Sequence, residues 1–287
     1  MFRKKAVILT LVLVMVLGSA NIVLAAGPSP FATPPTPEWP HNGAVAPDYQ
    51  PSPQDLRALQ IKTKSLMDSI DPDYHEGFAV HRGTPHFAMP PVARGVTPKW
   101  WYYYRVLPLE KVWKEPNDAA HVNYCGPGAT QVALDVRLPK SEVPDIDTIG
   151  RMEHINPHWG VYMSNVVITL NNILRVHGDI PNSNGFVAYE LAYPDSMWNL
   201  FWYIRWDIQK GYATVSGVKT DYMPGWNGRK AYHIVAVFGI YYDSEYNNYY
   251  KYAETASRMA GYNGPFAQWA FWQDFYQWYS QNPVISW

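Results

Sequence analysis

The stretch NYCGPGATQVALD, residues 123–135, contains the only cysteine of this 287-residue chain. Pro127 lacks a backbone N–H and is tolerated in the first turn of a helix, where that N–H would have no partner. Apolar residues then recur at helical spacing, which predicts a helix over 126–136. A thiol beside a helix N-terminus lies at the positive end of the macrodipole, which favours the thiolate. The stretch therefore predicts a nucleophilic Cys125.

Two glycines flank Pro127, and their lack of side chains affects how closely a substrate could approach the Cys125 thiol. Gly126 and Gly128 lack side chains, so we expect a substrate backbone to approach Cys125 at these positions without a clash. The alternative for Cys125 is a buried, inert residue that acts as a small hydrophobe. On composition alone that alternative is favoured slightly, so the neighbours of Cys125 decide between the two.

The N-terminus has the layout of a secretory signal peptide. Three basic residues precede an apolar run over 6–17, and Val23-Leu24-Ala25 offers a small-residue cleavage site, so we expect residues 1–25 to be removed. The alternative is an uncleaved membrane anchor, because no charge interrupts residues 6–26. Gly18 and neighbouring small and polar residues break the run and favour cleavage. We therefore expect a secreted, extracellular protein with no membrane segment beyond the signal.

Charge and cysteine count exclude several classes of function. The signal peptide carries three of the 23 basic residues and no acidic one, which leaves 20 basic against 24 acidic residues in the mature chain. A nucleic-acid binder needs a concentrated basic face, and no long run of Lys or Arg occurs. A single cysteine in an exported protein cannot form an intramolecular disulfide, which points to intermolecular pairing or a reactive thiol.

Composition divides the mature chain into three parts. Residues 26–53 are rich in proline and are typical of an extended, solvated linker that leads away from the cell surface. Residues 54–115 form an N-terminal extension, with a helix that begins at Ser52 and Pro53 as cap and first position. The aromatic run over 99–106 predicts a strand at the end of this extension. Residues 116–287 form the main domain.

The main domain has helix signals mostly first and strand signals mostly last, which favours an α+β fold over an alternating parallel sheet. The predicted helices cover residues 126–136, 163–176, 195–210 and 265–280. The predicted strands cover residues 186–192, 212–218, 231–242 and 248–254.

A histidine and a glutamate occupy the predicted hairpin over 231–254. His233 begins an apolar strand, where a polar imidazole needs a hydrogen-bond partner. Folding the chain back about Asp243 returns Glu254 to the end where His233 lies. A carboxylate there would orient the imidazole and stabilise its charged form. Taken alone, a core histidine with a structural partner is the commoner explanation.

The order of these residues resembles cysteine peptidase family thirty-nine, the bacteriocin-processing type with a papain-like fold. There a Cys-Gly-Pro motif opens the central helix, a His begins a later strand, and an acid closes the next strand. The matching positions are Cys125, His233 and Glu254, and the resemblance covers roughly residues 116–280. It implies an N-terminal helix packed by an antiparallel sheet, a Cys-His-acid triad, and no cofactor.

The sequence departs from that family at two positions. Glu254 replaces the usual Asp and is longer by one methylene. The family's oxyanion-hole Gln, about six residues before the Cys, corresponds to Ala119. The side chains near enough in sequence to replace that donor are Asn117, Asn123 and His121. Loss of one oxyanion donor costs on the order of 10²–10³ in rate.

No metal or cofactor is required by this chemistry. His154 and His158 have the spacing of a metal pair, but Pro157 disfavours a helix between them. His75, His81 and His86 meet no standard ligand spacing. The C-terminal aromatic residues, Trp269, Trp272, Tyr276 and Tyr279 among them, are expected to pack into the core.

The sequence therefore predicts a secreted cysteine peptidase acting on peptides or proteins, with cell-wall peptide among the candidate substrates. Two alternatives stay open. One is an inactive, peptidase-like binding protein for cell-wall or extracellular ligands, which Ala119 favours. The other is acyl transfer through the same thioester chemistry, which the sequence does not separate from hydrolysis.

Overall fold

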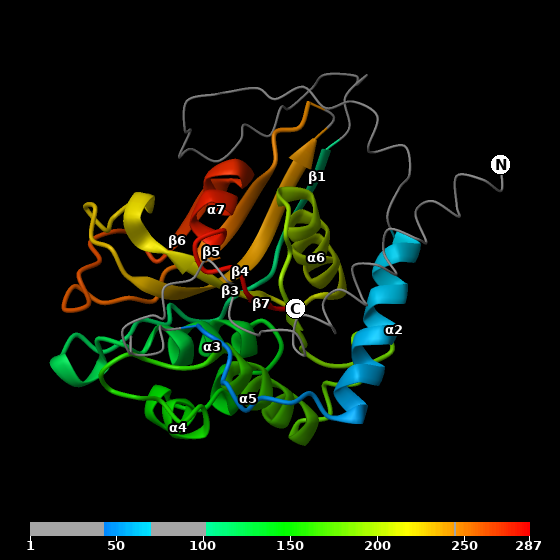
Figure 1. Cartoon of the computed structure of the whole chain (residues 1–287), viewed down its shortest axis with the longest axis horizontal. Coiled ribbons are helices and arrows are strands. Elements are labelled where there is room, and N and C mark those ends of the chain that lie inside the picture. Colours follow the sequence, from blue (N-terminus) through cyan, green and yellow to red (C-terminus); the bar gives the residue numbers. More distant parts are fainter. Residues whose placement is uncertain (1–42, 70–101, 244) are drawn as a thin grey trace, which may run out of the picture. The chain divides into compact units, whose positions relative to one another are not determined.

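The computed structural model describes residues 43–69, 102–243 and 245–287, which form a mixed α/β fold built on an antiparallel sheet (Figure 1). The predicted signal peptide, most of the predicted linker and His75, His81 and His86 lie outside the described residues.

All strand pairs of the sheet are antiparallel. The strands follow the order β2 (Leu191–Ala192), β7 (Ile285–Ser286), β3 (Thr214–Lys219), β4 (Tyr232–Asp243), β5 (Tyr249–Ala253) and β6 (Ala267–Phe271). A further strand, β1 (Tyr102–Val106), pairs with the second half of β4. Strand β4 is thus the centre of the sheet, flanked by β3 along its first half and by β1 along its second.

The helices of the described residues are α2 (Pro53–Ser69), α3 (Cys125–Asp135), α4 (Ile146–Met152), α5 (Met163–Val176), α6 (Met197–Lys210) and α7 (Trp272–Tyr279). Every residue of α3 is buried, because the helix packs against β4 as well as α4 and α5. Helices α6 and α7 lie together against the sheet (Figure 1), where Phe201 of α6 meets Tyr242 and Phe275 of α7 meets Tyr250.

The predicted elements agree with the structure in most places. The Ser52 hydroxyl accepts a hydrogen bond from the Asp55 N–H at 3.2 Å, and the Asp55 carboxylate accepts one from the Ser52 N–H at 2.8 Å, so the predicted cap is confirmed. The predicted helix over 163–176 coincides with α5.

Two of the predicted elements are wrong in part. The helix expected over 265–280 is a strand over its first part, because residues 267–271 pair with β5 to form β6, and only α7 is helical. The strand expected over 186–192 is reduced to β2, because only Leu191 and Ala192 have a strand partner. In the first segment sequence periodicity did not separate helix from strand, and in the second it did not show that residues 186–190 lack a strand partner.

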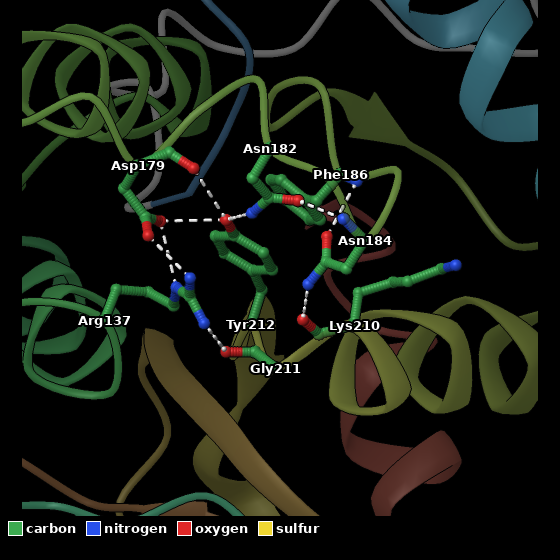
Figure 2. A network of polar contacts seen from close by, with 8 residues as sticks. All are labelled: Arg137, Asp179, Asn182, Asn184, Phe186, Lys210, Gly211 and Tyr212. Atoms are coloured by element: carbon green, nitrogen blue, oxygen red, sulfur yellow. Dashed lines mark hydrogen bonds and ion pairs between the residues drawn. The ribbon is translucent and has the colours of Figure 1, made fainter.

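The C-terminal end of α3 is held by a polar network (Figure 2). The Arg137 guanidinium binds both carboxylate oxygens of Asp179, at 2.9 and 2.5 Å, and stacks over the Tyr212 ring at 4.3 Å. Figure 2 shows that the Tyr212 hydroxyl lies between Asp179 and Asn182, and it donates to the Asp179 carboxylate at 2.8 Å. The network joins the residues that follow α3, α5 and α6, so it fixes the direction of the helix that begins at Cys125.

Helix α2 is anchored by a fully buried lysine. The Lys62 ammonium donates to the Ala188 carbonyl at 2.8 Å and lies 3.8 Å from the buried Asp207 carboxylate. It also lies over the rings of Phe186 and Trp287, at 4.2 and 4.4 Å from their centroids. Burial lowers the pKa of Lys62 to about 8, although Asp207 opposes this shift. One side chain thus supplies most of the polar anchoring of α2.

Candidate active site

Cys125 is the first residue of α3, at the end that meets the start of β4. Its side chain is buried, with 4% of the residue exposed. The backbone N–H groups of Ile234 and Gly126 point toward its sulfur. Ile234 directly follows His233 on β4, so the thiol lies at the backbone of the strand position next to the predicted base.

The two glycines beside Cys125 have a different role from the one expected. A Cβ at Gly126 would lie 2.2 Å from Cγ1 of Val161, and one at Gly128 would lie 2.6 Å from Oγ1 of Thr255. Such distances are far inside van der Waals contact, so both glycines permit close packing by the protein itself. The expectation that they admit a substrate backbone is wrong, because these positions are already filled.

His233 and Glu254 form the central contact of the site. The His233 Nε2 lies 2.7 Å from the Glu254 Oε1, and both side chains are almost fully buried. The antiparallel pairing of β4 and β5 produces this contact, as the predicted hairpin requires. The extra methylene of Glu254 therefore does not keep its carboxylate from the imidazole.

Glu254 is held by two further donors. The Ala256 N–H reaches Oε1 at 3.0 Å, and the Trp226 indole N–H reaches Oε2 at 3.0 Å. Burial would raise the pKa of Glu254, but the charge of His233 and these hydrogen bonds lower it below its ordinary value. Glu254 is therefore ionised. An ionised carboxylate only accepts hydrogen bonds, so Nε2 of His233 carries the proton and Nδ1 is the basic nitrogen.

Trp226 covers this pair, and it is a site residue that sequence reasoning missed. Its ring meets His233 edge-on, with centroids 4.9 Å apart, and the residue is buried. No sequence pattern marks Trp226 as a partner of Glu254, because the two residues lie 28 positions apart and meet only in the fold. A buried indole beside an acid–imidazole pair excludes water from it, which strengthens the hydrogen bond.

The state of the thiol differs from the expectation. Burial raises the pKa of Cys125 well above its ordinary value, and the carboxyls of Glu115 and Glu254 raise it further. The Ile234 and Gly126 N–H groups oppose this shift and do not outweigh it. The helix N-terminus therefore does not produce a resting thiolate. Cys125 holds its proton until a base removes it.

Glu115 is a site residue that sequence reasoning missed. It is 4% exposed, its N–H donates to the Thr255 carbonyl at 2.9 Å, and its Oε1 accepts from the Thr255 hydroxyl at 3.3 Å. Its Oε2 is buried and makes no hydrogen bond within the described residues. No sequence pattern marks it, because it reaches the site only through the contact with the residue after Glu254.

The three oxyanion candidates have other partners. The Asn123 amide donates to the Pro157 carbonyl at 2.6 Å, and the Asn117 carbonyl accepts from the Met259 N–H at 2.8 Å. His121 places its two ring nitrogens on the carboxylates of Asp118 and Asp147, at 2.7 and 3.1 Å. Ala119 lies in a short exposed turn with no polar side chain to offer.

The segment at residues 43–46 packs against the residues before α5 and against Ile234 of β4. The Gly43 N–H donates to the Val161 carbonyl at 2.8 Å, and the Met163 N–H donates to the Ala44 carbonyl at 2.7 Å. A Cβ at Gly43 would lie 3.4 Å from Cγ1 of Ile234. The segment therefore packs on the side of the site formed by Val161 and Ile234.

The remaining predicted features are placed as follows. His154 lies in the turn after α4 with φ of 53°, and His158 follows it in the loop before α5. Within the described part of the chain, no group of three or more His, Cys, Asp or Glu could hold a metal ion. The C-terminal aromatics Trp269, Trp272 and Tyr279 are buried, as expected, and Tyr276 is partly buried.

Comparison with known proteins assigns no family. No protein-family model matches the chain, and no curated protein matches it. Across residues 43–69, 102–243 and 245–287, no helix has the length and apolar character needed to cross a bilayer.

Proposed function

We propose that this protein is a secreted cysteine peptidase of papain-like fold, in which Cys125 is the nucleophile, His233 the general base and Glu254 the residue that orients the base. The observation that carries the proposal is the buried contact between His233 and Glu254, made on the strand whose Ile234 N–H meets the Cys125 sulfur. If His233 and Glu254 formed only a structural ion pair, no thiol would be required beside Ile234.

The chemistry follows from the protonation states. Because Cys125 rests as a thiol, the base takes its proton as the sulfur attacks the carbonyl carbon of a peptide bond. The neutral Nδ1 of His233 is the nitrogen that accepts this proton, since Glu254 holds the proton on Nε2. The resulting imidazolium then protonates the leaving amine, and water hydrolyses the thioester.

Glu254 stabilises the imidazolium that forms in this step. Its carboxylate is already ionised, buried and fixed by the Ala256 N–H and the Trp226 indole, so it needs no reorganisation when charge develops on the ring. The substrate class proposed is peptides or proteins outside the cell, with cell-wall peptide included.

A second candidate is a binding protein of the same fold without activity. The engaged amide of Asn123 and the engaged ring nitrogens of His121, together with Ala119, favour it, because these three positions supply no oxyanion donor in this arrangement. The bond recorded for Asn117 uses its carbonyl oxygen as an acceptor. Acyl transfer to an amine is the third candidate, and it uses the same steps as far as the thioester.

The test incubates the full chain with a proteome-derived peptide library and identifies new termini by mass spectrometry. We expect new termini with the wild-type protein and none with Cys125→Ser or His233→Ala. Added hydroxylamine should capture the acyl group of the thioester as a hydroxamate. If added amines, in place of water, became joined to the acyl group of the substrate, the result would assign acyl transfer to this protein.

Iodoacetamide alkylation of Cys125 provides a measurement that needs no substrate. We expect His233→Ala to slow alkylation, because the base that takes the thiol proton is removed. Identical peptide products from the wild type and Cys125→Ser, with alkylation unchanged in His233→Ala, would overturn the peptidase proposal and favour the binding protein.

A further inference from the structure

Glu115 brings a second buried carboxyl to the Cys125 site. Its backbone is fixed to Thr255 by the 2.9 Å hydrogen bond, and the Thr255 side chain packs against Gly128, in the first turn of α3. Thr255 also directly follows Glu254. The carboxyl of Glu115 is therefore anchored between the helix that begins at Cys125 and the strand end that carries the acid of the triad.

The two carboxyl oxygens of Glu115 differ in their hydrogen bonds. Oε1 accepts from the Thr255 hydroxyl, whereas Oε2 is buried and makes no hydrogen bond within the described residues. The Ser257 N–H also favours the charged form, but it does not outweigh burial. A buried carboxylate with an unsatisfied oxygen is costly, and the neutral acid is much less so. Burial and the charge of Glu254 both raise the pKa of Glu115 well above its ordinary value.

The charged and titratable groups around Glu115 come from three elements. Glu254 and Cys125 face it from the end of β5 and the start of α3, and His233 lies beyond Glu254 on β4. Lys114 is its chain neighbour, but the Lys114 ammonium is directed to the Ala256 carbonyl at 3.3 Å and over the Tyr262 ring. Lys114 lowers the pKa of Glu115 without offsetting burial and Glu254.

We propose that Glu115 acts on Cys125 through its charge: it is a neutral carboxylic acid while the thiol reacts, and its ionisation opposes removal of the Cys125 proton. This inference rests on the proposed function, since it assigns a regulating residue to that same site. Glu115 is the largest electrostatic influence on the Cys125 sulfur. The site therefore works with one carboxylate, Glu254, and keeps the second carboxyl uncharged.

The experiment measures the rate of iodoacetamide alkylation of Cys125 against pH in the full chain, with the label located by mass spectrometry. Glu115→Gln removes the ionisable group and keeps an oxygen that accepts from Thr255. We expect the inflection of its profile to shift to lower pH by about one unit, with about tenfold faster alkylation at pH values where Glu115 of the wild type is ionised and equal rates where it is neutral. A Glu115→Gln profile that superimposes on the wild type overturns the inference.

Glu190→Gln is the matched control. Glu190 is also a buried carboxyl with one oxygen that makes no hydrogen bond within the described residues, and burial raises its pKa to about 8. Its electrostatic neighbours are Lys62, Asp55 and Arg175, so its loss should leave the Cys125 profile unchanged. If Glu190→Gln shifted the Cys125 alkylation profile by the same amount, the loss of any buried carboxyl would explain the effect, and the inference would be overturned.

A second measurement uses the wild type alone, so the inference stays testable even if Glu115→Gln does not fold. Two groups that influence each other titrate over a wider range than one. We expect a Cys125 profile broader than a single titration, and a single-group curve contradicts the proposal. The His233→Ala result is separate, because it tests the peptidase assignment, whereas the Glu115 comparison needs only the ionisation of Cys125.

Discussion

His233 and Glu254 lie 21 residues apart in the chain, yet their side chains meet at 2.7 Å inside the protein. The hairpin of β4 and β5 brings the two residues to the same end of the sheet. Because Glu254 accepts three hydrogen bonds there, its charge is maintained where an isolated buried carboxylate would take up a proton.

Glu254→Gln should remove most of the activity. A glutamine amide can donate to Nε2, which places the ring proton on Nδ1 and removes the basic nitrogen that the proposed mechanism requires. We expect turnover of cleaved peptides to fall by on the order of 10³–10⁴. Glu254→Asp, which retains a carboxylate on a shorter side chain, is the control and should lose less. Equal activity in Glu254→Gln and the wild type would show that His233 needs no orienting acid.

Glu153 should make stability depend on pH. It is fully buried on α3's side of the site, where its Oε1 accepts from the Thr130 hydroxyl, and burial raises its pKa from 4.5 to about 8. Between these values the folded protein holds a proton that the unfolded chain releases. The free energy of unfolding therefore falls as pH rises through this window, by about 1.4 kcal/mol per unit where the difference is complete.

Glu153→Gln should flatten this fall while it preserves the hydrogen bond from Thr130. The measurement is urea unfolding of both proteins at several values from pH 5 to pH 8, with the difference in slope as the result. Glu142→Gln, at a carboxylate that is 46% exposed, is the control and should leave the slope as in the wild type. An unchanged slope in Glu153→Gln would mean that Glu153 is not a neutral acid in the folded state.

Lys62→Ala should destabilise the protein strongly. The change removes the ammonium from the Ala188 carbonyl and leaves the buried Asp207 carboxyl without its cation. Loss of one partner of a buried pair costs about 3–5 kcal/mol. Lys64→Ala is the control on the same helix, because the Lys64–Asp68 pair is largely exposed and should contribute less than about 1 kcal/mol. Thermal and urea unfolding measure the stability of both variants. Similar losses of stability in Lys62→Ala and Lys64→Ala would mean that Lys62 does not anchor α2.

Gly126→Ala should be destabilising in a way that a second change relieves. The new methyl would lie 2.2 Å from Cγ1 of Val161, and overpacking of this kind costs about 1–3 kcal/mol. Val161→Ala removes the clashing methyl, so the double variant should lose less stability than the sum of the single changes, by about 1 kcal/mol or more. Additive losses in a urea double-mutant cycle would argue against close contact between these residues.

The sequence by itself determined most of the helices and strands and the return of Glu254 to His233. Helical spacing predicted α5, the cap at Ser52 predicted the start of α2, and the apolar run after His233 predicted the hairpin that returns Glu254. These features depend on local periodicity, capping and a short turn, which neighbouring residues specify. The secondary structure of the aromatic segments was harder to predict, because residues 267–271 form a strand only through pairing with β5.

Only the tertiary structure decided the environment of the site. It placed Trp226 over the His233–Glu254 pair and brought Glu115 to Cys125, through contacts that no spacing in the chain reveals. It also reversed the expectation for the thiol. The position at a helix N-terminus is local and favours the thiolate, but burial and nearby carboxyls depend on the whole fold, and here they outweigh it.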